Sequence, residues 1–289
     1  MSDAVIAVHG GAGAWGAGHD EAVAALTAAL RDGEAALRAG ADALTAVQAA
    51  VEVLEDAPIL NAGRGALPTA SGAHELDAAI MDGTSRAAGS VAAVRGVRHP
   101  IALARHLLDA SPHVMVVGEG ARVLAEEAGL ELVGPEWFDT EVDSQPAIAP
   151  AGGSPHGTVG AVALDAAGRL AAATSTGGRQ GQVDGRVGDC PLIGAGTYAD
   201  NGCAVSATGD GEELIRAVAG HHVATLVRDG GVAVDVACDT VLREVKRLGG
   251  TAGLIAVDTE GTVALRFTTE AMARGFMRAG GEPFVAVRA

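Results

Sequence analysis

The chain has 289 residues, 48% of them hydrophobic, which is enough to bury a substantial core as one large domain or two modest ones. Its formal charge of −16 argues against nucleic acid and anionic membranes as partners, since both bind through clusters of Lys and Arg. Only 2% of the residues are aromatic, which leaves few surfaces for stacking on bases or sugars. A small polar ligand suits this composition best.

The N-terminus and the cysteines both predict a cytoplasmic protein. The opening residues, MSDAVIAVHGG, have no basic segment ahead of an apolar run, which a signal peptide would need. No uncharged apolar run approaches the length of a membrane span, so we expect no membrane contact. The three cysteines, Cys190, Cys203 and Cys238, are odd in number and lack CxxC spacing, which favours reduced thiols over a disulfide framework.

The first half of the chain predicts strands and helices in blocks. Several segments have apolar residues at helical spacing, and others are short apolar runs typical of buried strands. In chain order these are a strand at 4–8, helices at 20–38 and 41–54, a turn-rich loop at 61–65, a strand at 75–81, and helices at 100–108 and 119–128 on either side of a short strand, HVMVVG. From about 137 to 157 the chain is rich in Pro, Ser, Asp and Gly without periodicity, which predicts a flexible linker.

The second half begins with a predicted hairpin. An apolar run at 159–164, a break at Asp165-Ala-Ala-Gly168 and a second run at 170–173 indicate two strands buried on both faces. There follow a Gly-rich segment at 177–196, a strand at 204–207, helices at 212–228 and 233–248, and a hairpin at 254–267. Because strands and helices come in blocks rather than in strict alternation, the pattern favours a sandwich of sheets covered by helices over a doubly wound parallel sheet.

Thr158 stands where the linker meets the first strand of this hairpin, directly after Gly157. A threonine hydroxyl is a poor nucleophile until a base removes its proton. A threonine at the start of a chain brings its own base, because a free α-amine titrates near about 7.7 to 8.0, whereas the same nitrogen inside a chain is an amide. The position therefore suits a nucleophile that cleavage of the chain liberates, and a glycine before it tolerates the strained backbone that cleavage needs.

Two further threonines end predicted strands beside glycines: Thr176 in ATSTGG and Thr208 in ATGDGE. Three such hydroxyls could meet at one edge of a sheet, although Thr is also simply a good strand residue. Arg186 and Asp189 lie three residues apart in the Gly-rich segment, where such a pair is more often a surface ion pair than a clamp for a ligand.

Other patterns suggest different chemistry and are weaker. Residues 11–16 match the GxGxxG fingerprint of dinucleotide-binding proteins, but the next helix starts too late and no second strand ends in an acidic residue. His74 lies in the stretch HELD. In a strand, His74 would point to one face and the two acidic residues of this stretch to the other, so they would not bind one metal ion together. We expect His221-His222 to be a surface pair on a helix, and Cys190 to be a small buried side chain rather than a nucleophile.

Seven short motifs lie in order between His9 and about Leu226: HGGAG, LEDAPILNAGRGA, HELDAAIMDG, HGTVGAVALD, ATSTGG, GRVGD and ATGDGE. Together they resemble the plant-type L-asparaginase/isoaspartyl peptidase family of N-terminal-nucleophile hydrolases. Each motif is weak alone, but seven in the family's order are specific. The resemblance implies an α+β fold, namely the αββα four-layer sandwich of these hydrolases.

The resemblance also implies self-cleavage between Gly157 and Thr158. Residues 1–157 would then form an alpha subunit, ending in the linker, and residues 158–289 a beta subunit of the same domain. Thr158 would become the N-terminal residue of the beta subunit and the nucleophile of the enzyme. Thr176 would lie beside Thr158 and orient its hydroxyl.

Further site residues follow by the same resemblance. The Thr208 hydroxyl and the Gly209 amide would form an oxyanion hole, aimed at the charge that develops in the tetrahedral intermediate. Arg186 would hold the α-carboxylate of the substrate with its planar fork, and Asp189 the α-ammonium, with Gly211 beside them.

Asn61, in the NAG loop, would support the active site. The loop that contains it resembles a structural site for a sodium or potassium ion, built from backbone carbonyls, and no cofactor for catalysis is implied. The carbonyls are those of Leu54, Glu55, Ala57, Leu60, Ala62 and Arg64. The implied assembly is a dimer of cleaved alpha–beta heterodimers.

The activity implied is hydrolysis of L-asparagine to L-aspartate and ammonia, and of β-aspartyl dipeptides, through an acyl-enzyme on Thr158. The alternative is a glycosylasparaginase-like enzyme, which cleaves the same bond when the amide carries a sugar. Glycosylasparaginases typically have Asp before the nucleophile, whereas Gly157 stands there in this chain. This difference favours the first activity.

Overall fold

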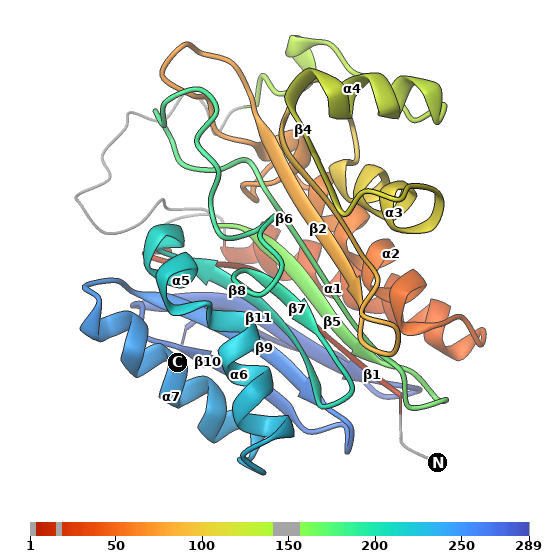
Figure 1. The fold of residues 1–289 in the computed structure, drawn as a ribbon, viewed down its shortest axis with the longest axis vertical. Coiled ribbons are helices and arrows are strands. Elements are labelled where there is room, and N and C mark those ends of the chain that lie inside the picture. Colours follow the sequence, from red (N-terminus) through yellow and green to blue (C-terminus); the bar gives the residue numbers. More distant parts are fainter. Residues whose placement is uncertain (1–3, 16–18, 141–156, 289) are drawn as a thin grey trace.

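The computed structural model describes residues 4–15, 19–140 and 157–288. Figure 1 shows a mixed fold in which helices lie against two β-sheets, and the described residues form one sheet of eight strands and one of four. In spatial order the larger sheet consists of β12 (Phe284–Ala286), β11 (Ala271–Arg278), β1 (Val5–Gly13), β5 (Val159–Leu164), β6 (Leu170–Thr176), β2 (Leu76–Asp82), β3 (Ala88–Val94) and β4 (Met115–Val117). The smaller sheet consists of β10 (Val263–Phe267), β9 (Ala252–Asp258), β8 (Cys203–Gly209) and β7 (Thr197–Ala199).

Helices pack against both sheets. In the order of the chain they are α1 (His19–Arg38), α2 (Ala43–Glu55), α3 (Pro100–Ala110), α4 (Gly118–Glu127), α5 (Gly211–Ala217), α6 (Ala219–Arg228) and α7 (Val234–Arg247). The larger sheet contacts α1, α2 and α3, with α4 beside β3 and β4, and the smaller sheet contacts α5, α6 and α7. The two sheets contact each other through β1, β5 and β6 on one side and β8 and β9 on the other. These contacts confirm a mixed fold of helices and sheets.

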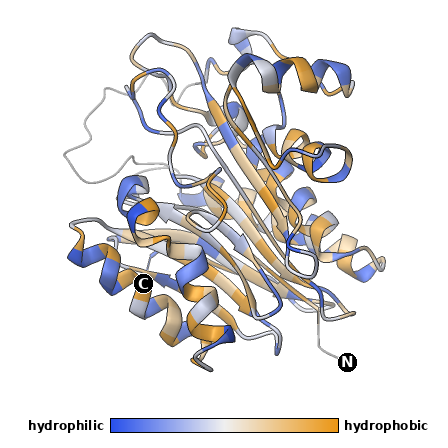
Figure 2. Ribbon diagram, in the orientation of Figure 1, coloured by the Kyte–Doolittle hydropathy of each residue, from blue (hydrophilic) through white to orange (hydrophobic). Residues whose placement is uncertain are grey.

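Alternate residues of β1 belong to two different apolar cores. Ile6 and Val8 pack in the core between the larger sheet and its helices, whereas Val5 and Ala7 pack in the core shared with the smaller sheet. This division follows from the pleat of a strand, which sends successive side chains to opposite faces. Figure 2 shows hydrophobic residues along the strands and both hydrophobic and hydrophilic residues along the helices that cover them.

The strand that follows Thr158 lies near the middle of the larger sheet. β5 pairs antiparallel with β1 on one side and with β6 on the other, and all three strands are buried along their whole length. Strands covered on both faces read as continuous apolar runs, which is why the sequence predicts this hairpin well.

Two predictions about element boundaries were wrong, and some strands were not predicted. β1 does not end at the HGGAG motif but continues through it to Gly13, with an irregular register between His9 and Ala12. The glycines at 11 and 13 therefore lie in a strand rather than in a turn that opens a helix, which removes the geometric basis for a dinucleotide site. The helix predicted at 212–228 is divided at Val218, whose φ of 47° is left-handed, and β3 and β11 were not predicted. Gly16 and residues 141–156 of the predicted linker lie outside the described residues.

Gly89 on β3 allows α3 to approach the sheet closely. A Cβ atom at this position would stand 1.9 Å from the carbonyl oxygen of Ala104 in α3, so the helix would have to move. We expect Gly89→Ala to lower the free energy of unfolding by about 1–3 kcal/mol through overpacking. Urea or thermal unfolding would measure the change.

Gly120→Ala in α4 provides the matched control for this substitution. The nearest atom to its Cβ position is 3.5 Å away, an ordinary contact, and Ala is the better helix former by up to about 1 kcal/mol. Equal effects of the two substitutions would contradict the assigned contact between β3 and α3.

Candidate active site

The side chains of Thr158 and Thr176 meet at one end of the β5–β6 hairpin. The Thr158 hydroxyl donates to the Thr176 Oγ1 at 3.0 Å, and the backbone N–H of Gly178 donates to the same oxygen at 3.1 Å. Thr158 immediately precedes β5, and Thr176 is the last residue of β6. The antiparallel hairpin therefore brings the predicted nucleophile and the hydroxyl expected to orient it into direct contact.

Asn61 fixes the turn that follows Thr176. Its side-chain amide donates to the carbonyl of Gly178 at 2.6 Å, and its backbone carbonyl accepts from the N–H of Gly177 at 3.0 Å. The Asn61 Oδ1 in turn accepts from the N–H of Leu67 at 3.1 Å. Asn61 is almost fully buried and has these hydrogen-bond partners on both sides, and its supporting role in the site stays a prediction.

Gly157 lies between Gly11 and Thr208. A Cβ atom on Gly157 would stand 2.8 Å from the Cα of Gly11 and 3.0 Å from the Thr208 Oγ1. Gly11 itself has a φ of 108°, and a Cβ atom there would stand 2.4 Å from the backbone of Gly157. The buried Thr208 Oγ1 also accepts from the N–H of Ala12 at 3.3 Å. The residue before Thr158 is thus enclosed by a strand and a hydroxyl that leave no space for a larger side chain.

These groups surround one pocket. Its lining brings Thr158 together with Asn61, Thr208 and Gly209, which the sequence predicts as site residues. The complete lining in the described part of the chain is Ala12, Asn61, Gly157, Thr158, Gly178, Arg179, Thr208, Gly209, Asp210, Thr251 and Thr269.

The three predicted substrate-binding residues form a second group. A Cβ atom on Gly211 would stand 2.9 Å from the Asp189 Oδ1 and 3.0 Å from the Arg186 Nη2, so the three residues are neighbours. They do not line the pocket around Thr158, but Asp210, which does, directly precedes Gly211. The Arg186 guanidinium donates to Glu212 at 2.9–3.1 Å, so its ion pair is with Glu212.

The side chain of Asp189 is a buried carboxyl with a raised pKa. Burial raises its pKa to about 7, while the positive charge of Arg186 acts in the opposite direction. Within the described residues its Oδ2 has no hydrogen-bond partner. A buried acceptor of this kind gains free energy when a cationic donor reaches it, and an ammonium group is such a donor.

Comparison with known proteins identifies the family. A family model described as "Asparaginase" matches residues 2–287. The chain belongs to the asparaginase family. It is 46% identical over 306 aligned residues to an isoaspartyl peptidase of Escherichia coli strain K12, which covers 98% of this chain and 95% of that protein. It is 42% identical to a plant-type L-asparaginase of Pyrobaculum calidifontis, over 95% of this chain and 97% of the relative.

Another relative is a probable isoaspartyl peptidase/L-asparaginase 2 of Arabidopsis thaliana. The two chains are 38% identical over 99% of the length of each. The resemblance seen in the sequence motifs, and the prediction of an enzyme of this hydrolase family, are confirmed. No helix in the described part of this asparaginase-family chain is long and apolar enough to cross a membrane.

A buried polar network behind Thr158 was not predicted from the sequence. The Nε2 of His9 lies 2.8 Å from the Ser206 Oγ, which lies 2.8 Å from the Thr174 Oγ1, and Thr197 donates to Thr174 at 2.7 Å. Burial lowers the pKa of His9 to about 3, so its ring is neutral at physiological pH. Gly160 makes room for the network, because a Cβ there would stand 2.1 Å from the Ser206 Oγ.

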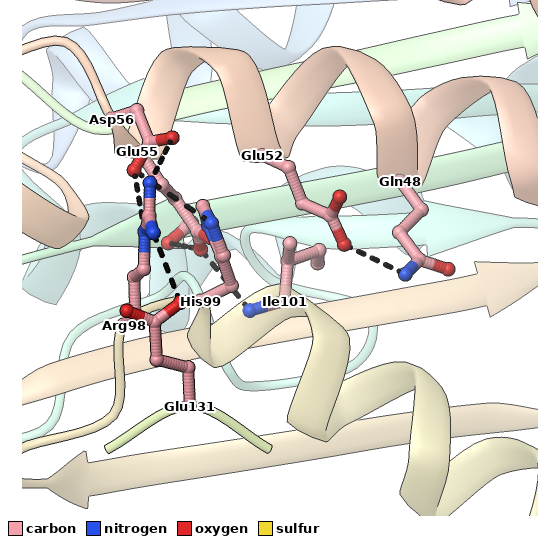
Figure 3. Close-up of polar contacts among 9 residues, drawn as sticks. Gln48, Glu52, Glu55, Asp56, Arg98, His99, Ile101 and Glu131 are labelled. Atoms are coloured by element: carbon pink, nitrogen blue, oxygen red, sulfur yellow. Dashed lines mark hydrogen bonds and ion pairs between the residues drawn. The ribbon is translucent and has the colours of Figure 1, made fainter. Parts of the chain in front are cut away.

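The carboxylate of Glu55 was also missed, since the sequence predicts only its carbonyl as a cation ligand. Its Oε1 accepts from the Ser175 hydroxyl at 2.6 Å and from the N–H of Ile101 at 3.1 Å, and its Oε2 lies 3.2 Å from the His99 Nδ1. Figure 3 shows Glu55 at the end of α2, facing His99 and Ile101 at the start of α3. One carboxylate therefore ties α2 and α3 to the residue next to Thr176.

Glu55 and His99 influence each other's pKa. Burial raises the pKa of Glu55, and burial alone would lower that of His99, but the hydrogen bond and charge of Glu55 outweigh this and raise the His99 pKa. The neighbouring Asp56 binds Arg98, which also binds Glu131, as Figure 3 shows.

The loop after Glu55 has the groups that a structural cation needs. Backbone N–H groups within the loop already donate to the carbonyls of Leu54, Ala57, Leu60 and Ala62. A carbonyl oxygen has two lone pairs, so each of these retains one for an ion. The carbonyl of Glu55 lies against Gly63, where a Cβ would stand 2.5 Å away. The loop residues therefore fit the predicted alkali cation by their chemistry.

Glu55→Ala is expected to destabilise the protein strongly. It leaves the buried donors of Ser175, Ile101 and His99 without their acceptor, which predicts a loss of about 3–5 kcal/mol in the free energy of unfolding. Glu55→Gln keeps an acceptor for Ser175 and should lose less. Glu52→Gln, on the same helix but only partly buried, is the control and should change stability by under about 0.5 kcal/mol. Denaturant unfolding that ranked Glu52→Gln with Glu55→Ala would contradict this assignment.

Proposed function

We propose that this protein is an amidohydrolase that cleaves the side-chain amide of L-asparagine and the isopeptide bond of β-aspartyl dipeptides. The observation that carries the proposal is the hydrogen bond from Thr158 to Thr176 in a pocket that Thr208 and Gly209 also line. The names of the relatives, isoaspartyl peptidase and L-asparaginase, support the same pair of substrates.

Self-cleavage before Thr158 is the first step of the proposed mechanism. The Thr158 Oγ1 attacks the carbonyl carbon of Gly157, the acyl group moves from nitrogen to oxygen, and water hydrolyses the resulting ester. The enclosure of Gly157 by Gly11 and Thr208 supports this step, because it places the Thr208 hydroxyl, 3.0 Å from where a Cβ of Gly157 would stand, next to the residue whose carbonyl would be attacked. Residues 1–157 become the alpha subunit and residues 158–289 the beta subunit of one domain.

The liberated amine of Thr158 then serves as the base for catalysis. With a pKa near about 7.7 to 8.0, it accepts the proton of the hydroxyl as the oxygen attacks the β-carbonyl of the substrate. The Thr208 hydroxyl and the Gly209 N–H stabilise the oxyanion, and the amine returns the proton to the departing ammonia or amino acid. Water attacks the β-aspartyl ester in the same way and releases aspartate.

The aspartyl unit of the substrate is oriented by its two α-substituents. Arg186 binds the α-carboxylate, and Asp189, with Gly211 beside it, binds the α-ammonium. The pKa of about 7 at Asp189 means that a protonated fraction is present at neutral pH in the free enzyme. The arriving ammonium group stabilises the carboxylate form, so binding of the substrate favours the ionised state of the Asp189 side chain.

The proposal also includes the predicted four-layer fold, the structural cation and the dimer. The contacts of α1–α3 with the larger sheet, of the two sheets with each other, and of α6 and α7 with the smaller sheet support an αββα four-layer arrangement. The carbonyls around Asn61 would hold a structural sodium or potassium ion, which would stabilise the loop without entering the reaction. A dimer of cleaved heterodimers in the cytoplasm completes the proposal.

Substitution of Thr158 tests the shared nucleophile. Thr158→Ala is expected to abolish self-cleavage and to reduce hydrolysis by at least about a thousandfold, because both need the same hydroxyl. Thr158→Ser keeps the hydroxyl and should retain part of each activity. Intact-mass spectrometry and ammonia release measure the two steps, and normal processing of the Ala variant would exclude the mechanism.

A panel of substrates tests the proposed specificity. We expect β-Asp-Leu to be cleaved with a higher kcat/KM than L-Asn, and α-Asp-Leu not to be cleaved, because its blocked α-carboxylate cannot bind Arg186. Glycosylated Asn is the fourth substrate, and the few aromatic residues predict poor binding of its sugar. Efficient cleavage of α-Asp-Leu would contradict the clamp, and a clear preference for glycosylated Asn would support the glycosylasparaginase alternative.

A further inference from the structure

The pocket around Thr158 has a cationic side chain that the proposed mechanism does not use. Arg179 lines this pocket, three residues after Thr176. Its side chain is 45% exposed, and its ion pair with Glu212 is a single contact of 3.5 Å, at the outer limit of a hydrogen bond. Arg179 therefore has donors available to a molecule in the pocket.

Two nearby carboxylates, Glu212 and Asp210, already accept hydrogen bonds from other donors at short distances. Glu212 accepts three contacts of 2.9–3.1 Å from Arg186, so its charge is satisfied largely without Arg179. Asp210, the acidic residue of the pocket lining in the described residues, accepts from both the N–H and the hydroxyl of Thr251, at 2.8 and 3.1 Å. Among the described residues, neither carboxylate holds the Arg179 guanidinium at a distance below 3.5 Å, so its donors remain largely available to a molecule in the pocket.

We propose that Arg179 is a specificity-determining residue that binds the carboxylate of the leaving amino acid. This inference rests on the proposed function. With the aspartyl unit held by Arg186 and Asp189 and its carbonyl at Thr158, the leaving group extends along the rest of the pocket lining. In a β-aspartyl dipeptide it ends in a free carboxylate, for which a guanidinium is the matching partner. The preferred substrates are then dipeptides rather than longer or blocked peptides.

Because the protein has a large net negative charge, a cationic side chain in the pocket should affect which substrates bind well. A β-aspartyl dipeptide with an uncharged side chain has a net charge of −1, whereas L-asparagine is a neutral zwitterion, and the chain carries −16. A local cation offsets the repulsion that the dipeptide would otherwise meet. A half-exposed charge pair contributes up to about 1 kcal/mol, so the expected preference is about fivefold.

The test compares substrates that differ only in the leaving carboxylate. kcat/KM is measured for β-Asp-Leu, β-Asp-leucinamide and L-Asn with the wild type and with Arg179→Met, which keeps length and removes charge. The wild type should prefer β-Asp-Leu over the leucinamide by about fivefold, and Arg179→Met should remove this preference. L-Asn, which has no leaving carboxylate, should change by less than about twofold in Arg179→Met. Arg179→Lys should restore part of the preference.

Arg216→Met is the matched control. Arg216 lies on α5, 59% exposed and paired with Glu213, and it does not line the pocket. It should leave all three rates and the preference unchanged. A uniform loss on all three substrates in Arg179→Met, or an unchanged preference, would overturn the inference while leaving the proposed function intact. Absence of hydrolysis of every substrate by the wild type would instead overturn the proposed function.

Discussion

The position of Thr158 depends on the pairing of β5 with strands on both sides. Gly160 lies opposite His9 of β1 and opposite Thr174 of β6, and Val159 lies opposite Ser175. Because both faces of β5 are buried, a slip of one residue would exchange the faces and place every apolar side chain in the wrong core. The register that satisfies the two cores is also the one that brings Thr158 to Thr176. Packing of the interior thus sets the geometry of the site.

Small residues are the second constraint, because they allow backbones to approach one another. Gly160 leaves space for the contact between His9 and Ser206, and Gly11 and Gly157 fit against each other where no side chain would. A composition with 42 glycines and only 2% aromatic residues is consistent with such close approach. The site is therefore built mainly from backbone and hydroxyl groups, with few large side chains. This suits a small polar substrate better than a ligand that needs stacking surfaces.

The sequence predicts those parts of the fold that depend on local pattern. The β5–β6 hairpin is recognisable because its runs are continuous and broken by a single turn, and Thr176 and Thr208 are recognisable as strand ends beside glycine. The break at Val218 leaves no such signal, because a left-handed valine is an exception to its own preference. The bond between Glu55 and Ser175 joins residues 120 positions apart, so no local pattern contains it. Such contacts follow only from the tertiary arrangement.

In the proposed function, the charges of the site allow an acidic protein to bind an aspartyl unit that carries both an α-carboxylate and an α-ammonium. Asp189 is buried, and its pKa of about 7 reflects the cost of keeping an isolated negative charge there. Arg186 acts against this cost but is itself engaged by Glu212. In the proposed complex the α-ammonium favours the charged form of Asp189. The α-carboxylate replaces bulk water beside Arg186 and adds to the negative charge around that side chain. In this proposal, a ligand without the α-ammonium would leave the buried Asp189 Oδ2 without a partner, so the ammonium as well as the carboxylate would define the aspartyl unit.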